Sequence, residues 1–591
     1  MKSAILLFGM LLLGVSSVFA QDMQYVSSQS GDTLAVKDDI DFGSGNTLYL
    51  LMKSDSLAPA TRVYMLKAGG TYSCANNPVS SSTHKTIIMG PEQNIKKGTI
   101  TPPVVCGFYS SNTNTTGGMN VGMDLLVKNI DFEIGNTNGG SGGWAFFNFN
   151  GPNMKLQVDN CILEHTWWCW VGGPPQLSTV KFTNDYMVNM DGHSCRRNGG
   201  ITDFNSGSAF LQDTLLVENC THVNFQGTAY KFRVGYVVNR AIFNHNDFID
   251  CAGYVIMNNG DQTNLSITNN IYVNCQLQDY SVPLFTADKG EVDEDGLPMG
   301  LVNLRVDSVF TANVGSHGVY VDKNLAYWDP SLANIDSILN ATQVDNRTDW
   351  ASQRIVANSR TTTLFADDAT YPTLYNGTWI NKKPNFAGTD VLFTTQLATI
   401  KSYAIACVDT TYGTPLDSWR TSANPEGANF VYADFPIPID LSYDDADLKV
   451  AGLGGFPLGD LGWFPTELAS WKSQAATEYA SIQTAVNTGT PVSTAVQTTT
   501  QQPPQNFELQ QNYPNPFNPS TVISYSIAKA GNVTLKVYSL LGQEVATLVN
   551  GYQAANTYHV SFNASGLASG VYLYELRSGS NVASGKMLLM K

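Results

Sequence analysis

The sequence predicts an all-β protein in which a long solenoid of short parallel strands is followed by a small β-sandwich. Three observations predict this fold class: a strand-like motif that recurs in the middle of the chain, an excess of Asn and Gly, and a low content of charged residues. The chain has 591 residues, of which 51 are Gly, 14% are charged and 43% are hydrophobic. Of its 51 Asn residues, 25 lie between positions 101 and 300. The formal net charge of −16 disfavours binding to nucleic acid.

The N-terminal residues predict export from the cytoplasm. Lys2 is followed by an apolar run from Ile5 to Leu13 and by a small-x-small cleavage site that ends at Ala20. This is the pattern of a secretory signal peptide over 1–20. No later stretch has the roughly 20 apolar residues that a membrane helix needs, so we expect no transmembrane segment. The nine cysteines are an odd number and too sparse for a disulfide scaffold, so most are expected to be small buried residues.

A motif of two apolar residues two positions apart, then x-Asn, then further apolar residues recurs six times. We call the Asn site the ladder position; it holds Asn129, Asn160, Asn184, Asn219, His245 and Asn269, at steps of 31, 24, 35, 26 and 24 residues. Period-2 strands at such a repeat predict stacked coils about 4.8 Å apart. Asn suits the bend because it tolerates left-handed backbone angles and can bond to the coil above or below. A β-sandwich with irregular strands is the alternative, but it does not explain Asn in this register.

These coils resemble the right-handed parallel β-helix of the pectate-lyase-like superfamily. The segments Arg62–Tyr72 and Thr86–Gly90 are similar to the opening coils of that fold. The resemblance covers roughly 30–310 and rests on the strand pattern, without a catalytic signature. It implies a right-handed parallel β-helix; coils are not assigned from the sequence over 311–460.

The C-terminal third ends in a helix, a linker and a second domain. Apolar residues at helical spacing from Leu468 to Val486, stopped at Asn487-Thr488-Gly489, predict an amphipathic helix that caps or packs along the solenoid. Residues 488–505 contain no charged or aromatic residue and predict an extended or flexible linker. Alternating segments then predict a small β-sandwich. These strands are expected at 522–527, 533–538, 558–562, 571–576 and 586–590.

The tail resembles the C-terminal sorting domain of the type IX secretion system. The matching motifs are Asn512–Thr521, Tyr538–Val545, Leu567–Tyr572 and Lys586–Lys591. The resemblance implies a Bacteroidetes-type envelope, contact with the type IX machinery, and secretion or display on the outer-membrane surface. An ordinary Ig-like module is the alternative, but it leaves the motif set unexplained. We expect a signal peptide at 1–20, a β-helix domain with C-terminal loops and a capping helix at 21–487, a linker at 488–505 and the sorting domain at 506–591.

A basic segment interrupts the acidic chain. Residues 181–240 hold six Lys or Arg against five Asp or Glu. Arg196 and Lys231 each lie 12 residues after a ladder position, so they are expected to stack on one outer sheet, with Arg233 on the same face as Lys231. Lyases of the family that the chain resembles need a Lys or Arg base in a cationic groove, often with calcium. The hypothesised catalytic residues are Lys231, Arg233 and Arg196; the hypothesised substrate-binding residues are Arg197, His193, His222 and Trp168. Alternatively, all of these are solvated outward residues.

Other candidate groups are less specific. Asp293 and Asp295, in the acidic segment 288–296, are candidate calcium ligands or part of a solvated insertion. No other cofactor is expected. At least one Trp of Trp167-Trp168-x-Trp170 should be in the core, since consecutive residues point to opposite sides. Cys251 and Cys275 share a register and are expected to stack rather than to form a disulfide.

The sequence therefore predicts a secreted or cell-surface β-helix protein, a monomer, that binds or degrades polysaccharide, as a polyuronate lyase if it is an enzyme. The alternative is a non-catalytic surface adhesin or coat protein on the same scaffold. A glycoside hydrolase would need a carboxylate pair, such as Asp185 with Asp191 or Asp213.

Overall fold

The structure is a computed structural model of the chain, which divides into two compact units, Met1–Ser493 and Thr494–Lys591. The described residues are 23–492 and 506–590, apart from 44, 56–57, 75–79, 108–117, 134–144, 167, 174–176, 191–199, 205–209, 233–235, 259–260, 263, 278–298, 305–316, 334–353, 389–395, 409–434, 513–514, 530, 554–555 and 565. The predicted signal peptide and most of the predicted linker lie outside this description.

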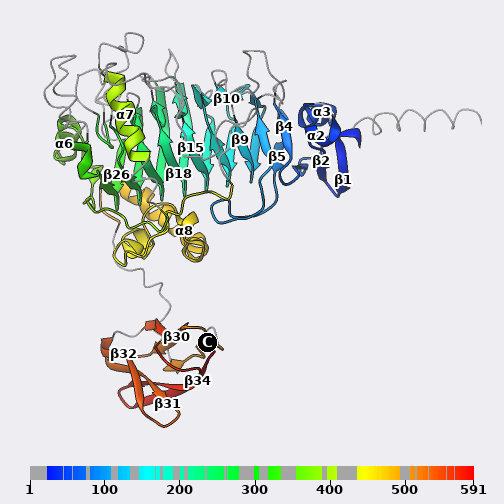
Figure 1. The fold of residues 1–591 in the computed structure, drawn as a ribbon. Coiled ribbons are helices and arrows are strands. Elements are labelled where there is room, and N and C mark those ends of the chain that lie inside the picture. Colours follow the sequence, from blue (N-terminus) through cyan, green and yellow to red (C-terminus); the bar gives the residue numbers. More distant parts are fainter. Residues whose placement is uncertain are drawn as a thin grey trace, which may run out of the picture. The chain divides into compact units, whose positions relative to one another are not determined.

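The first unit is a parallel β-helix of three sheets, whose coils follow one another in Figure 1 from blue through cyan to green. Sheet A contains β1 (Val26–Ser30), β2 (Thr33–Val36), β3 (Val63–Met65), β5 (Lys85–Met89), β8 (Asp124–Lys128), β11 (Lys155–Asp159), β14 (Thr179–Thr183), β17 (Phe210–Glu218), β20 (Tyr236–Asn244), β24 (Asn264–Thr268), β26 (Gly318–Asp322) and β28 (Leu374–Asn376), with β23 (Asp261–Gln262) beside β20. Sheet B contains β4 (Thr71–Ser73), β6 (Val104–Cys106), β9 (Asp131–Glu133), β12 (Ile162–Glu164), β15 (Tyr186–Met190), β18 (Thr221–Phe225), β21 (Asp247–Cys251), β25 (Ile271–Val273) and β27 (Leu325–Tyr327). Sheet C contains β7 (Met119–Val121), β10 (Ala145–Phe149), β13 (Cys169–Gly172), β16 (Gly200–Phe204), β19 (Tyr230–Phe232) and β22 (Ile256–Asn258).

The coils from β5 to β22 visit the three sheets in turn, and their inward side chains join one continuous core. β17, β18 and β19, for example, contribute Val217, Phe225 and Phe232 to this core. Apart from the antiparallel β1–β2 pair, neighbouring strands of this unit pair in parallel. The predicted solenoid is thereby confirmed, and the β-sandwich alternative is wrong for this unit.

The ladder positions form the corner between sheets A and B. All six predicted residues, from Asn129 to Asn269, have φ between 52° and 61°, the left-handed region that Asn tolerates better than most residues. Lys323 adopts the same conformation at the β26–β27 corner, with φ 57°. A second series, between sheets B and C, has the same conformation: His165, Asn189, Asn224, Asp250 and Asn274.

A second Asn ladder lies one residue after the first, inside the corner. Asn246, Asn270 and Asn324 are buried, and each bonds to the coil before it. Asn270 Oδ1 accepts from the backbone N–H of Asn246 at 2.9 Å, and Asn324 Oδ1 accepts from that of Asn270 at 3.0 Å. Their amide groups donate to main-chain carbonyls, Asn270 to Phe243 O at 3.0 Å and Asn324 to Ile267 O at 2.8 Å. These side chains therefore tie each coil to the next.

Asp185 occupies this inner position on an earlier coil and predicts a stabilising substitution. Its Oδ1 accepts from the Cys161 N–H at 2.8 Å, its Oδ2 has no hydrogen-bond partner among the described residues, and burial raises its pKa well above the usual value. Because the pKa of Asp185 is higher in the folded than in the unfolded protein, the folded state becomes less stable as the pH rises above about 3.9, the pKa of Asp in the unfolded chain. We therefore expect Asp185→Asn to increase the free energy of unfolding at pH 8 by about 1–3 kcal/mol, because Asn can donate where the carboxylate cannot.

Urea denaturation at pH 5 and pH 8 measures this effect. The gain should be larger at pH 8, and the exposed control Asp368→Asn should change stability by less than about 0.5 kcal/mol at either pH. A loss of stability in Asp185→Asn at pH 8 would contradict the assignment.

Residues after the main coils cover the outside of sheet B. A second apolar cluster joins outward residues of sheet B, such as Tyr186 and Ile249, to Leu441, Leu458 and Trp463. Each buried side chain of this size contributes about 1.5–3 kcal/mol. We call residues 435–464 the cover segment; it includes η6 (Leu448–Val450), η7 (Leu453–Gly455) and η8 (Leu461–Trp463).

The predicted amphipathic helix is α8 (Pro465–Thr488), which contacts β24 and β26 and ends at Gly489 with φ 66°. Its buried residues include Leu468, Trp471 and Val486, as the spacing predicted. The remaining helices are η1 (Met23–Tyr25), α2 (Asp39–Phe42), α3 (Thr47–Ser54), η2 (Pro330–Leu332), α6 (Ser359–Phe365) and α7 (Leu397–Val408).

The second unit contains two antiparallel sheets around one apolar core. Its strands are β29 (Glu508–Leu509), β30 (Ser520–Ile527), β31 (Gly531–Ser539), β32 (Glu544–Gln553), β33 (Asn556–Asn563), β34 (Gly570–Ser578) and β35 (Asn581–Leu589). One sheet has the order β29-β30-β33 and the other β32-β31-β34-β35. The five predicted strands are confirmed, whereas β29 and β32 were not predicted.

Candidate functional site

The predicted basic site lies on sheet C. In β19, Tyr230 and Phe232 belong to the inner core, so the alternation of the strand directs Lys231 outward. Lys231 is in register with Asp203 of β16, and its Nζ lies 3.5 Å from Asp203 Oδ2. Both side chains are buried, with exposed fractions of 1% and 2%. The strands thus place a buried ion pair on the outer face of sheet C.

The predicted stacking of Arg196 on Lys231 is wrong. The sheet neighbours of Lys231 are Asp203 on one side and Met257 on the other. Counting from the ladder position fails because the 35-residue step between these coils includes an insertion. Arg196, Arg197, His193 and Arg233 lie outside the described residues; in the chain, the first three precede β16 and Arg233 directly follows β19.

His222 is a core residue, which corrects the hypothesis that it binds substrate. Its ring stacks on Phe248 with the ring centres 4.2 Å apart, and it is fully buried. Nδ1–H donates to Asp247 O at 3.1 Å, and Nε2 accepts from the Tyr230 hydroxyl at 2.7 Å. Burial lowers the pKa of His222 to about 3, so the imidazole is neutral at physiological pH. It stabilises the contact between sheets B and C.

The remaining predicted positions are divided between core and undescribed residues. Trp170 is fully buried and packs on Phe146 with ring centres 5.3 Å apart, which confirms that one Trp of the triplet is in the core. Trp168 is half-buried, and Trp167 lies outside the described residues. So do Asp293 and Asp295; among the described residues, no group of three or more His, Cys, Asp and Glu is arranged to hold a metal ion.

Cys74, Cys161, Cys220, Cys251 and Cys275 are free and buried. Cys251 and Cys275 lie side by side in sheet register, and burial raises the pKa of Cys251 well above its usual value, with the neighbouring Cys275 contributing. The stacked, unbridged arrangement predicted for this pair is confirmed.

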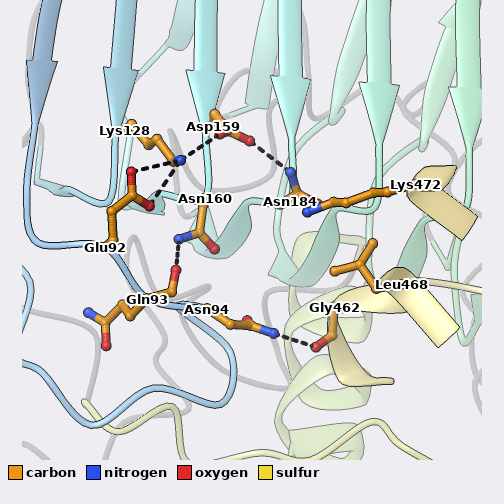
Figure 2. A pocket seen from close by; sticks show the side chains of 10 residues that line it. All are labelled: Glu92, Gln93, Asn94, Lys128, Asp159, Asn160, Asn184, Gly462, Leu468 and Lys472. Atoms are coloured by element: carbon orange, nitrogen blue, oxygen red, sulfur yellow. Dashed lines mark hydrogen bonds and ion pairs between the residues drawn. The ribbon is translucent and has the colours of Figure 1, made fainter. Parts of the chain in front are cut away.

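A polar pocket lies at the corner between sheets A and B, and we call it the corner pocket (Figure 2). The ends of three strands and their ladder residues supply Lys128, Asp159, Asn160 and Asn184, and the loop before them supplies Glu92, Gln93 and Asn94. The helix η8 supplies Gly462, and the first part of α8 supplies Leu468 and Lys472. The cavity volume is about 170 Å³. This site was not predicted from the sequence, although a polar residue precedes the ladder position in each of these copies.

Charges alternate across the corner pocket. Lys128 Nζ lies 3.0 Å from Glu92 Oε2 and 3.9 Å from Asp159 Oδ2. Asp159 Oδ1 also accepts from the Asn184 amide at 2.7 Å and from the Thr183 hydroxyl at 2.9 Å. The acidic and basic groups therefore compensate one another along the strand ends.

A buried ionic cluster lies beside the pocket and joins the cover segment to the coils. Lys96 has a side-chain exposure of 1%, pairs with Asp460 at 2.8 Å, and donates to Asn184 O at 2.6 Å and Asn219 O at 3.1 Å. Asp460 accepts in turn from the Thr221 hydroxyl at 2.7 Å. Burial raises the pKa of Asp247, with the charge of Asp460 contributing. We call Lys96, Asp460 and Asp247 the buried ionic cluster.

Among the six predicted ladder positions, the one without Asn has its own explanation in the structure. His245 Nε2 lies 3.6 Å from Glu478 Oε1 of α8, and its ring lies against Trp471. Burial raises the pKa of Glu478, but the hydrogen bond and charge of His245 outweigh this and bring the pKa below its usual value. His245 is therefore a contact between the corner and the helix that covers it.

Comparison with known proteins identifies the tail. A family model described as the secretion system C-terminal sorting domain matches residues 511–590, which confirms the predicted sorting domain. No curated protein matches the chain. Among the described residues, no helix is both long and apolar enough to cross a membrane. The chain therefore carries a type IX export signal and is secreted or placed at the cell surface.

Proposed function

We propose that this exported β-helix protein binds an acidic polysaccharide on the outer face of sheet C. The observation that supports the proposal is the outward Lys231–Asp203 pair on neighbouring strands. The chain segments that continue these strands carry further basic residues. His193, Arg196 and Arg197 precede β16, and Arg233 follows β19.

The proposed roles follow from charge and burial. Guanidinium groups bind carboxylates through two parallel hydrogen bonds, so Arg196, Arg197 and Arg233 are assigned to the sugar carboxylates. His193 and the half-buried Trp168 add a donor and an indole face against which a sugar ring can pack. Lys231 and Asp203 lie beneath the surface and hold the two strands in register.

Retention on immobilised polygalacturonate and alginate tests this proposal with the full mature chain. We expect Arg196→Ala/Arg233→Ala to weaken retention about tenfold at low salt, and added salt to weaken wild-type retention because the contacts are ionic. Lys155→Ala/Lys181→Ala, on the outer face of sheet A, is the charge-matched control. Equal retention of the double variant and the wild type would exclude the site.

A polyuronate lyase is the second candidate, and the outward direction of Lys231 on sheet C favours it. Such a lyase needs a Lys or Arg base that removes the proton beside a uronate carboxylate. The assay is the appearance of unsaturated sugars by ultraviolet absorbance. Lys231→Met/Asp203→Asn, which removes both charges of the pair, should abolish product formation while circular dichroism stays unchanged. Retention without product from the wild type supports an adhesin or another binding protein instead.

A further inference from the structure

The corner pocket has a rigid floor. Asn160 fixes the loop of residues 92–96, because its amide donates to Gln93 O at 2.6 Å and its Oδ1 accepts from the Ile95 N–H at 3.0 Å. On the opposite side, the Asn94 amide donates to Gly462 O at 3.0 Å. The loop, the strand ends and η8 are thus joined by hydrogen bonds around the cavity, as Figure 2 shows. Such a site needs little rearrangement to bind a ligand.

The charges of the pocket favour a neutral ligand. Its titratable groups are two carboxylates, Glu92 and Asp159, and two ammonium groups, Lys128 and Lys472. Lys128 is already placed between the two carboxylates. The total charge is balanced, so an anion gains little attraction here, unlike at a purely basic site.

Two polar groups at the wall are accessible to a ligand. The Glu92 side chain is 63% exposed, and its carboxylate can accept further hydrogen bonds beside its ion pair with Lys128. Lys472 is exposed, lies on α8 beside the pocket, and forms no ion pair within the described part of the chain. One group accepts a hydrogen bond and the other donates, which is the combination that a hydroxyl group satisfies.

The size of the cavity limits the ligand to one small unit. Its volume of about 170 Å³ is below the roughly 300–1,000 Å³ of pockets for drug-sized molecules. Leu468 supplies an apolar wall, against which the C–H face of a sugar ring can pack. A polyol ring with several hydroxyl groups matches the remaining amide, carboxylate and ammonium groups.

We propose that the corner pocket binds one neutral sugar residue, as the end or the side branch of a neutral polysaccharide. Its hydroxyl groups donate to the carboxylates of Glu92 and Asp159, and accept from Lys472. This site is on the corner between sheets A and B. It is independent of the proposed acidic-polysaccharide site on sheet C.

Isothermal titration of the full mature chain tests the proposal. The probes are hexaoses of β-1,4-linked glucose, mannose and xylose, with hexagalacturonate as the acidic comparison. We expect at least one neutral hexaose to bind, and Lys472→Ala and Glu92→Gln each to weaken that binding about tenfold, as for hydrogen bonds to charged groups. Both side chains are at the surface, so these substitutions should leave the thermal midpoint unchanged.

Lys155→Ala is the matched control. Lys155 is also exposed and lies on β11, the strand that ends at Asp159, but it is four residues away from the pocket. Its substitution should not change the affinity for any hexaose. The proposal is overturned if none of the neutral hexaoses binds, or if Lys472→Ala and Glu92→Gln bind as tightly as Lys155→Ala. Weakening of hexagalacturonate binding alone by Lys472→Ala would also overturn it, since that result indicates an anion site.

Discussion

Replacing Lys96 by Met is expected to lower the free energy of unfolding of the first unit by about 3–5 kcal/mol at pH 7. Lys96 is the cation of the buried ionic cluster, with Asp460 at 2.8 Å. Met keeps most of the side-chain volume, so the loss comes mainly from electrostatics and hydrogen bonds. It leaves a buried carboxylate without its cation and the carbonyl oxygens of Asn184 and Asn219 without a donor.

The neighbouring lysine provides a matched control in the same loop. Lys97 pairs with Asp440 at 2.7 Å, but the two side chains are 31% and 39% exposed. Because exposed ion pairs contribute little to stability, Lys97→Met should lower the free energy of unfolding by less than about 1 kcal/mol. Urea denaturation followed by Trp fluorescence measures both variants. Equal losses for Lys96→Met and Lys97→Met would show that the cluster does not hold the cover segment.

A second substitution tests whether the unpaired charge causes the loss of stability. Asp460→Asn removes the charge that Lys96→Met leaves unpaired, so the double variant should recover part of the lost stability. In Lys96→Met alone, the pKa of Asp460 should rise further, because burial already raises it and Lys96 opposes this effect. A carboxylate whose pKa is raised in the folded state makes the protein less stable as the pH rises. The loss in free energy of unfolding caused by Lys96→Met should therefore be smaller at pH 5 than at pH 8.

Asn270→Asp is expected to lower the free energy of unfolding of the first unit by about 3–5 kcal/mol at pH 8. The Asn270 amide donates to both Phe243 O and Asn324 Oδ1, each at 3.0 Å, so the new carboxylate would face two acceptors without a hydrogen to offer. The side chain is fully buried, and Asp has nearly the same shape, so no cavity contributes to the effect.

Measurements at two pH values distinguish this electrostatic cost from a packing defect. Burial should raise the pKa of the introduced Asp in the folded state, so the deficit should grow as the pH increases from 5 to 8. The control is Asn153→Asp, an exposed position at which Asn has φ 59° and Asp is also tolerated. A deficit that is the same at both pH values would contradict the explanation.

The strand pattern and the ladder could be predicted because they depend on neighbours in the sequence. Each ladder residue needs a left-handed angle, a local demand that selects Asn. The β26–β27 coil was not predicted, since Lys323 holds its ladder position and a long insertion separates it from Asn269. The exception at His245 depends on Glu478, more than 200 residues later, which no local pattern indicates.

The candidate sites were harder to predict for the same reason. Lys231 was correctly placed facing outward, but its partner Asp203 comes from an earlier coil across an irregular insertion. His222 is fully buried, although it was predicted to bind substrate. The alternation of a strand alone does not tell which of its two sides faces the core. The corner pocket needs the start of α8 to complete its wall, and Lys472 follows Lys128 by hundreds of residues.

The cover segment also determines the order in which the domain can be completed during synthesis. Coils contact mainly their immediate neighbours, so they can assemble progressively as the chain emerges. The contact between Asn94 and Gly462, 368 residues apart, cannot form until nearly the whole domain has been made. Until then the apolar outer face of sheet B is open to water and to other chains, so shortened forms that end before residue 435 should aggregate. A soluble fragment for biochemical work therefore has to include the cover segment and α8.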